Sequence, residues 1–427
     1  MSANLFEGAL TERTIFKDLT VLSPHYVPEA LPHRSEEVKK VVKALAPILR
    51  GEKPNNVFVY GKTGTGKTSV IKHVIRHLTE AANAEKSTTD IGIVYMNCRI
   101  GFNSKYQVLL KIVEDPYLNR PDHKERPLDG RTQMKLAGMS PTDLYKRLRK
   151  TVEANGIGLV IVLDEVDMVK DVDELIYLLT RINDEIEQVE KDGQKKLGRV
   201  VIIGITNSFS FKDKLDPRTK STLCEEDMVF RPYNADELST ILEERIKIGL
   251  KSGVIAESNV ALIAAYAAQT NGDARYALRL LQKAGEIAQK ESRDRIKKED
   301  VIAAKTGVEE DITFELVTTL PEHQQIVLYA IAELLIQGGN YKRLADMPPD
   351  ILFSGEAYEG YEKACKALNR TPRTMRWFRE YLNDLEMLGL VTLSVSGKGV
   401  RGNTSIIRLG SPPAEVKRIL QHSLGLK

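Results

Sequence analysis

The stretch "VYGKTGTGKTS" (residues 59–69) places three glycines directly ahead of Lys67 and Thr68. It fits the pattern G-x-x-x-x-G-K-[ST], with a β-rich segment before it and an amphipathic segment after it. Glycines let backbone N–H groups converge on phosphate oxygens, and the N-terminus of the following helix adds the positive end of its dipole. The stretch therefore predicts a phosphate-binding loop between a strand and a helix. A chance glycine-rich turn is the weaker explanation, because strand, loop and helix occur in the required order.

The same motif predicts the task of each side chain. Lys67 is expected to reach the β- and γ-phosphates, and the Thr68 hydroxyl is expected to bind Mg²⁺. The residues predicted to hold the nucleotide phosphates are Gly61, Lys62, Thr63, Gly64, Thr65, Gly66, Lys67, Thr68 and Ser69.

A second segment, "LVIVLDEVD" (residues 159–167), predicts a buried strand with acidic residues at its carboxyl end. Ligands of open α/β sheets bind at that end of the strands. We expect Asp164 to hold Mg²⁺, directly or through water, and Glu165 to polarise the attacking water. Acidic residues also end strands as helix caps, but the phosphate loop makes that alternative weaker.

Two further residues are candidate catalytic groups. "VVIIGITN" ends in Asn207, whose side chain would lie beside the γ-phosphate and orient the water, although asparagine at a strand end is also common turn chemistry. Arg275, in "NGDARYALRLL", lies off the apolar stripe in the first turn of a predicted helix. Positive charge is unfavourable there, which suggests an anionic neighbour, either a phosphate or a surface carboxylate.

The order of predicted elements indicates three domains. Four predicted strands, at 55–61, 92–99, 159–167 and 199–207, alternate with helices up to about residue 230, which favours an α/β fold with a parallel, doubly wound sheet. Consecutive helices follow, and from residue 312 three helices and a β-hairpin around "KGVRGN" describe a winged helix. The first helix, 35–50, is expected to begin after a serine cap. The predicted domains are 1–230, with an insertion at about 100–140, then 231–311 and 312–427.

Composition narrows the class of protein. A chain of 427 residues is too long for one core, and 42% apolar with 28% charged residues is ordinary for a globular protein. No apolar leader or membrane-length run occurs, so we expect neither export nor a membrane partner. Cys98, Cys224 and Cys365 lie far apart, which favours reduced, buried thiols over a disulfide or zinc framework. We expect a cytoplasmic protein.

Together, "GKTGTGKT", "VIVLDEVD", "GITN" and "GDARYAL" in this order resemble an AAA+ ATPase with a helical lid. The segment "LDPRTKSTL" (215–223) and the C-terminal winged helix narrow the resemblance to the archaeal replication initiators of the origin-recognition and cell-division-control type. The resemblance covers nearly the whole chain. It implies ATP or ADP with Mg²⁺ as cofactors and slow hydrolysis, with the nucleotide acting mainly as a switch.

The resemblance also implies site residues and partners. Asn207 and Arg275 become the two sensor residues, and Tyr26, Val27 and Pro28 frame the adenine. Arg218 falls in the segment where the family places an arginine finger, which contacts the nucleotide of a neighbouring subunit. Initiators that act without a stable ring do not require this contact. The implied partners are double-stranded origin DNA, a replicative helicase of the MCM type and paralogous initiators. A DNA partner implies a nucleoid-associated location.

The implied DNA contacts lie in two regions. Family members carry a DNA-touching insertion after the second strand, and its basic residues here include Lys105, Arg120 and Arg131, which a solvated surface excursion would explain equally well. Between residues 363 and 408 there are nine basic and three acidic residues, whereas the whole chain carries a formal net charge of only +3. Such a concentration suits a phosphate backbone better than a merely solvated or protein-binding helix. The predicted contacts in this region are Arg370, Arg373, Thr374, Arg376 and Arg379 on one helix, with Lys398 and Arg401 at the hairpin tip.

The sequence favours a replication initiator that binds origin DNA and helps recruit or load the helicase. One alternative is an ATP-gated winged-helix transcription regulator, which only the location of its binding sites would distinguish. Another is a branch-migration type DNA motor, which predicts a stable hexamer and DNA-stimulated hydrolysis. A clamp-loader subunit ranks last because that family lacks a C-terminal winged helix.

Overall fold

The computed structural model describes residues 15–24, 26–83, 89–127, 138–187, 189–191, 194–223, 225–338, 350–395 and 405–426. The chain divides into two units, Met1–Val301 and Ile302–Lys427. Within the described residues, no helix is long and apolar enough to cross a bilayer.

The first unit is built on a five-stranded parallel sheet in the order β2-β3-β6-β1-β7. Its strands are β1 (Asn56–Tyr60), β2 (Ile91–Asn97), β3 (Gly158–Asp164), β6 (Arg199–Thr206) and β7 (Glu225–Val229). The first four were predicted. The edge strand β7 was not predicted. Its sequence is "EEDMV", in which only Met228 is buried, so it lacks an apolar pattern.

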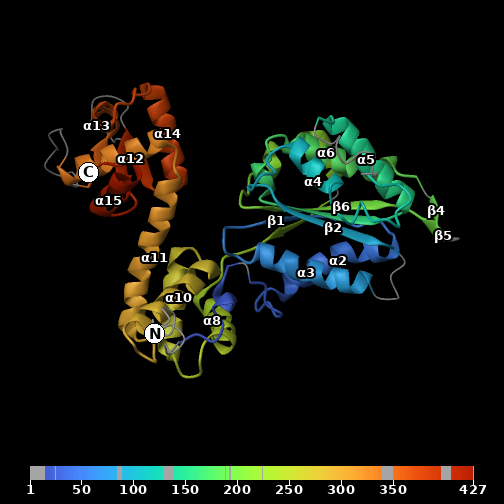
Figure 1. The fold of residues 1–427 in the computed structure, drawn as a ribbon, viewed down its shortest axis with the longest axis horizontal. Helices are drawn as coiled ribbons and strands as arrows, with labels where there is room; N and C mark the ends of the chain where they lie inside the picture. Colours follow the sequence, from blue (N-terminus) through green and yellow to red (C-terminus); the bar gives the residue numbers. More distant parts are fainter. Residues whose placement is uncertain are drawn as a thin grey trace, which may run out of the picture. The chain divides into compact units, whose positions relative to one another are not determined.

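Helices cover both faces of this sheet (Figure 1). Leu159, Ile161 and Leu163 of β3 pack on one face with α4 (Lys105–Val113), α5 (Pro141–Asn155) and α6 (Val172–Glu185). Val160 and Val162 pack on the other face with α2 (Ser35–Leu45) and α3 (Lys67–Ala82). Because successive side chains point to opposite faces, a strand covered on both sides must be apolar throughout.

The first helix differs from its prediction. Arg34, and not a serine, occupies the N-cap of α2, and Ser35 is already helical. The α-helix ends at Leu45 and continues as the 3₁₀ segment η2 (Ala46–Arg50), because Pro47 has no N–H to extend the α-helical pattern.

A helical lid completes the first unit. It contains α8 (Ala235–Gly249), α9 (Glu257–Thr270) and α10 (Ala274–Lys290). Asn234 and Glu237 form a capping box that starts α8. The Glu237 N–H donates to Oδ1 of Asn234 at 2.9 Å, and the Asn234 N–H donates to Oε2 of Glu237 at 3.0 Å. The next helix, α11 (Lys298–Thr319), is continuous through residue 311, where a domain boundary was predicted. The smaller elements of the unit are η1 (Leu19–Leu22), η3 (Val166–Met168), η4 (Lys212–Lys214), α7 (Pro217–Leu223), β4 (Val189–Lys191) and β5 (Gln194–Lys196).

The second unit is a winged helix, as predicted. It contains α12 (Glu322–Ile336), α13 (Ser354–Ala367), α14 (Met375–Met387) and an antiparallel sheet in the order β8-β10-β9. The strands are β8 (Leu352–Phe353), β9 (Val391–Val395) and β10 (Ser405–Leu409), and α15 (Pro413–Ser423) follows. Phe378, Leu382 and Leu385 attach α14 to the core. The sequence analysis did not predict β8 or α15.

Candidate functional site

A cavity at the carboxyl end of the parallel sheet brings most of the predicted nucleotide residues together. Its wall includes residues 63–69 of the phosphate loop, the strand-end residues Asp164, Glu165 and Asn207, and Arg275 from α10. Sheet order explains the meeting, because β6 lies between β1 and β3. Tyr60 is in register with Thr206, and Asp164 with Ile205, so the loops that follow these strands are neighbours.

The phosphate loop requires glycine where it approaches the lid. Gly64 and Gly66 have φ angles of 72° and 88°, a left-handed conformation that disfavours side chains. A Cβ at Gly64 would lie 1.7 Å from the Asp273 carboxylate, and one at Gly66 would lie 2.6 Å from the Tyr233 hydroxyl. The loop can therefore approach the lid this closely only where side chains are absent.

Lys67 is buried beneath the loop, with 6% of its surface exposed. Its ammonium donates hydrogen bonds to the carbonyls of Gly61 (2.7 Å) and Lys62 (2.8 Å) and to Oδ1 of Asn207 (2.9 Å). Burial lowers the pKa of Lys67 to about 8, against the attraction of Asp164. Lys67 and Asn207, each predicted to act at the γ-phosphate, thus lie in direct contact.

Nucleotide affinity is expected to fall above pH 8. The folded-state pKa of Lys67 is about 8, and its ordinary value is 10.5. In the folded protein the ammonium therefore loses its proton at a lower pH than an ordinary lysine does. ADP should bind about tenfold more weakly at pH 9 than at pH 7. Between these two pKa values the unfolded chain binds more protons, so this group makes the free protein more stable as pH rises. Titration calorimetry at both pH values checks the first effect, and an unchanged affinity would contradict it.

Thr68 and Asp164 meet beside the loop. The Thr68 hydroxyl donates to Oδ2 of Asp164 at 3.0 Å, and the Tyr95 hydroxyl donates to the same oxygen at 2.6 Å. Burial, together with the Asp164 hydrogen bond and charge, raises the pKa of Tyr95. The sequence analysis missed Tyr95, because a tyrosine within a strand carries no pattern that marks such a contact.

The predicted catalytic residues reach the cavity from three different elements. Glu165 has a left-handed backbone (φ 54°), and its carboxylate lies 3.8 Å from the Arg99 guanidinium. Asn207 contacts Lys67, as described above. Arg275 is exposed in the first turn of α10, where Asp273 caps the helix by accepting its N–H at 2.7 Å. The Ala274 N–H donates to the Gly64 carbonyl at 3.2 Å, so this part of the lid touches the phosphate loop.

Of the three residues expected beside the adenine, two lie in the wall of the same cavity. Tyr26 and Pro28 belong to its wall, while Val27 is not part of the lining. The Arg245 guanidinium of α8 lies 4.6 Å from the centre of the Tyr26 ring, and burial lowers the pKa of Arg245. The sequence analysis missed Arg245, since an arginine in "LEERIKIGL" carries no sign of being buried.

The arginines of the winged helix do not all lie on one helix, so that prediction was wrong. The helix α14 begins at Met375, after Pro372 and an extended Thr374, and so Arg370 and Arg373 precede it. Arg370 forms an ion pair with Glu322 at 2.8 Å.

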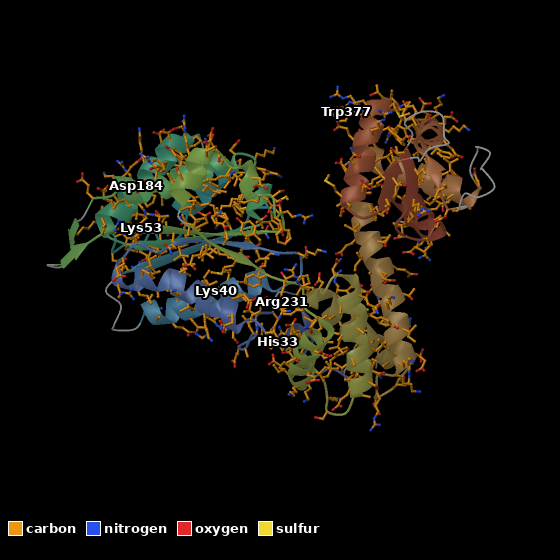
Figure 2. The ribbon with its side chains drawn as sticks, turned by 180° about the vertical axis from the view of Figure 1, so that it is seen from behind. His33, Lys40, Lys53, Asp184, Arg231 and Trp377 are labelled. Atoms are coloured by element: carbon orange, nitrogen blue, oxygen red, sulfur yellow. The ribbon has the colours of Figure 1, made fainter. Side chains whose placement is uncertain are left out.

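The remaining arginines surround the start of α14. Arg373 is held by its backbone, since its N–H donates to the Tyr361 hydroxyl (3.0 Å) and its carbonyl accepts from Tyr358 (3.0 Å). Arg376 and Arg379 are exposed on α14, and within the described residues neither makes an ion pair. Trp377, between them, is 54% exposed and lies on the outside of the unit (Figure 2).

The other predicted DNA contacts stand as follows. Lys105 is paired with Glu174, and Arg120 lies 4.0 Å from Asp90 and 3.5 Å from Asp122. Both side chains therefore already have acidic partners. Arg218 is exposed on α7.

Cys98 and Cys365 are free and buried, as predicted. Arg131, Lys398, Arg401 and Cys224 lie outside the described residues.

Comparison with known families gives three matches along the chain. Residues 30–186 match the AAA ATPase domain, residues 239–306 the Cdc6 AAA+ ATPase-type lid domain, and residues 315–419 the CDC6 C-terminal winged helix domain. The predicted α/β fold with lid and winged helix is confirmed by these matches.

Whole-chain relatives agree with the family matches. The chain is 39% identical to the ORC1-type DNA replication protein of Thermococcus onnurineus, covering 98% of this chain and 94% of the relative. Its structure is similar to that of the Aeropyrum pernix ORC1 protein, solved in complex with DNA, with a TM-score of 0.78, 35% identity, and 96% and 98% of the two chains covered. It is also similar to the Aeropyrum pernix ORC2 protein in its ADPNP–ADP complexes, with a TM-score of 0.60, 25% identity, and 96% and 98% covered.

The predicted resemblance and ATPase class are therefore confirmed. With a nucleotide-binding phosphate loop under a helical lid, followed by a winged helix, this chain is an AAA+ ATPase and belongs to the family of ORC1-type DNA replication proteins.

Proposed function

We propose that the protein is an ATP-dependent replication initiator that binds double-stranded origin DNA and helps recruit or load the replicative helicase. The observation that carries the proposal is the presence of a nucleotide site and an arginine-bearing winged helix in one chain of this family. The DNA-bound Aeropyrum pernix relative supports the DNA-binding part. Recruitment of an MCM-type helicase and association with paralogous initiators rest on membership of the family.

In the proposed nucleotide cycle, each residue acts from the position it occupies. Lys67 exchanges its carbonyl partners for phosphate oxygens, and the N–H groups of the loop hold the remaining oxygens. Glu165 orients and deprotonates the attacking water, and Asn207 positions it. Arg275 approaches the phosphates from the lid, so phosphate loss changes what holds the lid in place.

Thr68 and Asp164 are the proposed Mg²⁺ ligands. Their oxygens lie 3.0 Å apart at the end of the phosphate loop, and both are hard donors of the kind that Mg²⁺ prefers. The donor set therefore fits this ion, which would neutralise charge on the phosphate oxygens when bound.

Glu165→Gln should separate binding from hydrolysis. The amide keeps the size of the side chain but cannot accept a proton, so turnover should fall by about 10²- to 10⁴-fold while ATP affinity stays nearly unchanged. Single-turnover hydrolysis and equilibrium binding of labelled ATP measure the two effects. Turnover close to that of the wild type would remove Glu165 from its proposed role.

In the proposed DNA complex, the N-terminal part of α14 enters the major groove. Arg376 lies on the exposed side of that helix, and the two tyrosine contacts hold Arg373 directly ahead of it. A guanidinium so placed can donate two bonds to a guanine edge or neutralise a phosphate.

The chain carries its own reporter for this complex, because Trp377 is its single tryptophan and lies beside Arg376. Binding of a labelled duplex can be followed by anisotropy while Trp377 emission and its quenching by acrylamide are recorded. We expect DNA to shield Trp377, and Trp377→Phe to remove the signal while retaining binding. Binding without shielding would exclude α14 as the contact, and absence of duplex binding at low salt would contradict the proposed function.

A further inference from the structure

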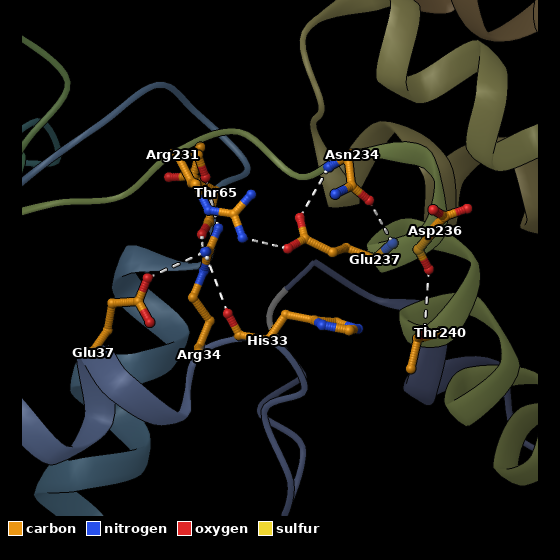
Figure 3. Close-up of polar contacts among 9 residues, drawn as sticks. All are labelled: His33, Arg34, Glu37, Thr65, Arg231, Asn234, Asp236, Glu237 and Thr240. Atoms are coloured by element: carbon orange, nitrogen blue, oxygen red, sulfur yellow. Dashed lines mark hydrogen bonds and ion pairs between the residues drawn. The ribbon is translucent and has the colours of Figure 1, made fainter.

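Arg34 is fully buried under the phosphate loop, with 0% of its surface exposed. A buried guanidinium must find partners for its N–H groups. Nε donates to the Thr65 carbonyl (3.1 Å), and Nη2 donates to the Arg231 carbonyl (2.7 Å). Nη1 pairs with Glu37 at 3.3 Å (Figure 3). One side chain therefore joins the phosphate loop to residues 230–234, the linker between β7 and α8.

Arg34 holds this linker at the point where it passes from the sheet to the lid. The N–H of Phe230 still pairs with the Tyr60 carbonyl of the sheet at 2.8 Å. The N–H of Tyr233 already pairs with the Gly272 carbonyl of the lid at 3.2 Å. The Arg231 carbonyl lies between these two attachments, and the Tyr233 ring centre lies 4.0 Å from the Arg34 guanidinium. Arg34 thus contacts the hinge of the lid.

On the lid side, the linker is tied to α8. Nη2 of Arg231 donates to Oε1 of Glu237 at 2.7 Å, and Oε2 of Glu237 accepts the N–H of Asn234 in the capping box (Figure 3). The Glu237 carboxylate is buried, so the pair is better shielded from water than an ordinary surface ion pair. A displacement of the Arg231 backbone is therefore passed to the first turn of α8.

On the loop side, the Thr65 carbonyl belongs to the segment that Lys67 also contacts. The Thr65 hydroxyl donates to the Lys62 carbonyl at 2.9 Å, and the Lys67 ammonium donates to the same carbonyl at 2.8 Å. A phosphate in the loop competes with that carbonyl for the ammonium. Nucleotide binding is therefore expected to alter the backbone that Arg34 holds.

We propose that Arg34 is a positioning residue that transmits phosphate occupancy from the loop to the lid hinge. The guanidinium is rigid and planar, and its Nε and Nη2 bonds to two backbone carbonyls fix the distance between them. This backbone route is separate from any contact that Arg275 makes with a phosphate. It rests on nucleotide binding at the phosphate loop and does not depend on DNA binding.

Hydrogen exchange of the full chain, with and without saturating ADP, tests the coupling. In the wild type, ADP should slow exchange both in the phosphate loop and at residues 233–238. In Arg34→Lys, which keeps the charge but loses the two-pronged geometry, the loop should still slow and residues 233–238 should not. The kcat for ATP should fall by about tenfold or more with KM changed less, because the lid is no longer positioned. A variant that loses thermal stability but keeps the response at 233–238 would show a purely structural role and overturn the proposal.

Arg231→Met provides a second test that leaves the contacts of Arg34 in place. The Arg231 side chain is 64% exposed, so the fold should tolerate its replacement, while its carbonyl still meets Arg34. We expect the ADP response to stop at the linker and to be lost at residues 235–238. Arg50→Met, which breaks the exposed 2.7 Å pair with Glu52, is the matched control and should leave the response intact. A full response at 235–238 in Arg231→Met would also overturn the proposal.

Discussion

Lys67→Ala should lower kcat/KM for ATP by about 10²- to 10³-fold or more and make ADP binding too weak to detect at micromolar concentrations. The ammonium is the buried cation of the loop, and it also holds Asn207 at 2.9 Å. Its removal therefore takes away the phosphate contact and releases the residue proposed to position water. Steady-state hydrolysis and titration calorimetry measure both losses.

The control for this variant is Lys40→Ala, which removes an equal charge from the exposed face of α2 (Figure 2). It should change kcat/KM by less than about twofold, since an exposed charge outside the nucleotide site contributes little. Circular dichroism should give the same spectrum for Lys67→Ala and the wild type. Hydrolysis by Lys67→Ala within tenfold of the wild type would contradict the role proposed for Lys67.

Combined Arg373→Ala and Arg376→Ala should weaken duplex DNA binding by about 2–6 kcal/mol, since each base-reading or phosphate contact contributes about 1–3 kcal/mol. If both guanidinium groups neutralise phosphates, the slope of log K against log salt should also fall by about 2. Anisotropy titrations at several salt concentrations measure both quantities. Nucleotide binding should be unchanged, because the phosphate loop lies in the other unit.

A matched variant removes the same charge from a neighbouring helix. Lys363→Ala with Lys366→Ala takes two exposed positive charges from α13 of the same unit. A small loss for this pair and a large loss for the arginine pair would place the contact at the start of α14. Equal losses would indicate that only the net charge of the unit matters, and an unchanged affinity in the arginine pair would exclude the assigned contact.

The nucleotide site could be predicted where residue type and strand order suffice. The glycines, Lys67, Thr68, Asp164 and Asn207 follow strands whose carboxyl ends must meet in a parallel sheet. Arg34, Tyr95 and Arg245 could not be predicted in this way. Each acts through burial against a segment distant in sequence, and neither periodicity nor a motif encodes such a contact.

The winged helix shows a second limit of sequence patterns. Spacing by three placed Arg370 and Arg373 on the same helix as Arg376, but Pro372 and the extended Thr374 delay the helix until Met375. Charge spacing gave no warning of this, and the pairing of Arg370 with Glu322 depends on the packing of α12. The apolar positions Phe378, Leu382 and Leu385 do follow the helical period of α14, because burial imposes it.

Mapping the positions of this protein along its own chromosome tests the proposed initiator function most directly. Chromatin immunoprecipitation should give one or a few sharp peaks that coincide with the sites where replication starts, measured in the same cells by marker frequency. The Arg373→Ala, Arg376→Ala variant should lose these peaks. Peaks distributed over many promoters, with none at a replication start site, would contradict an initiator and indicate an ATP-gated regulator of transcription.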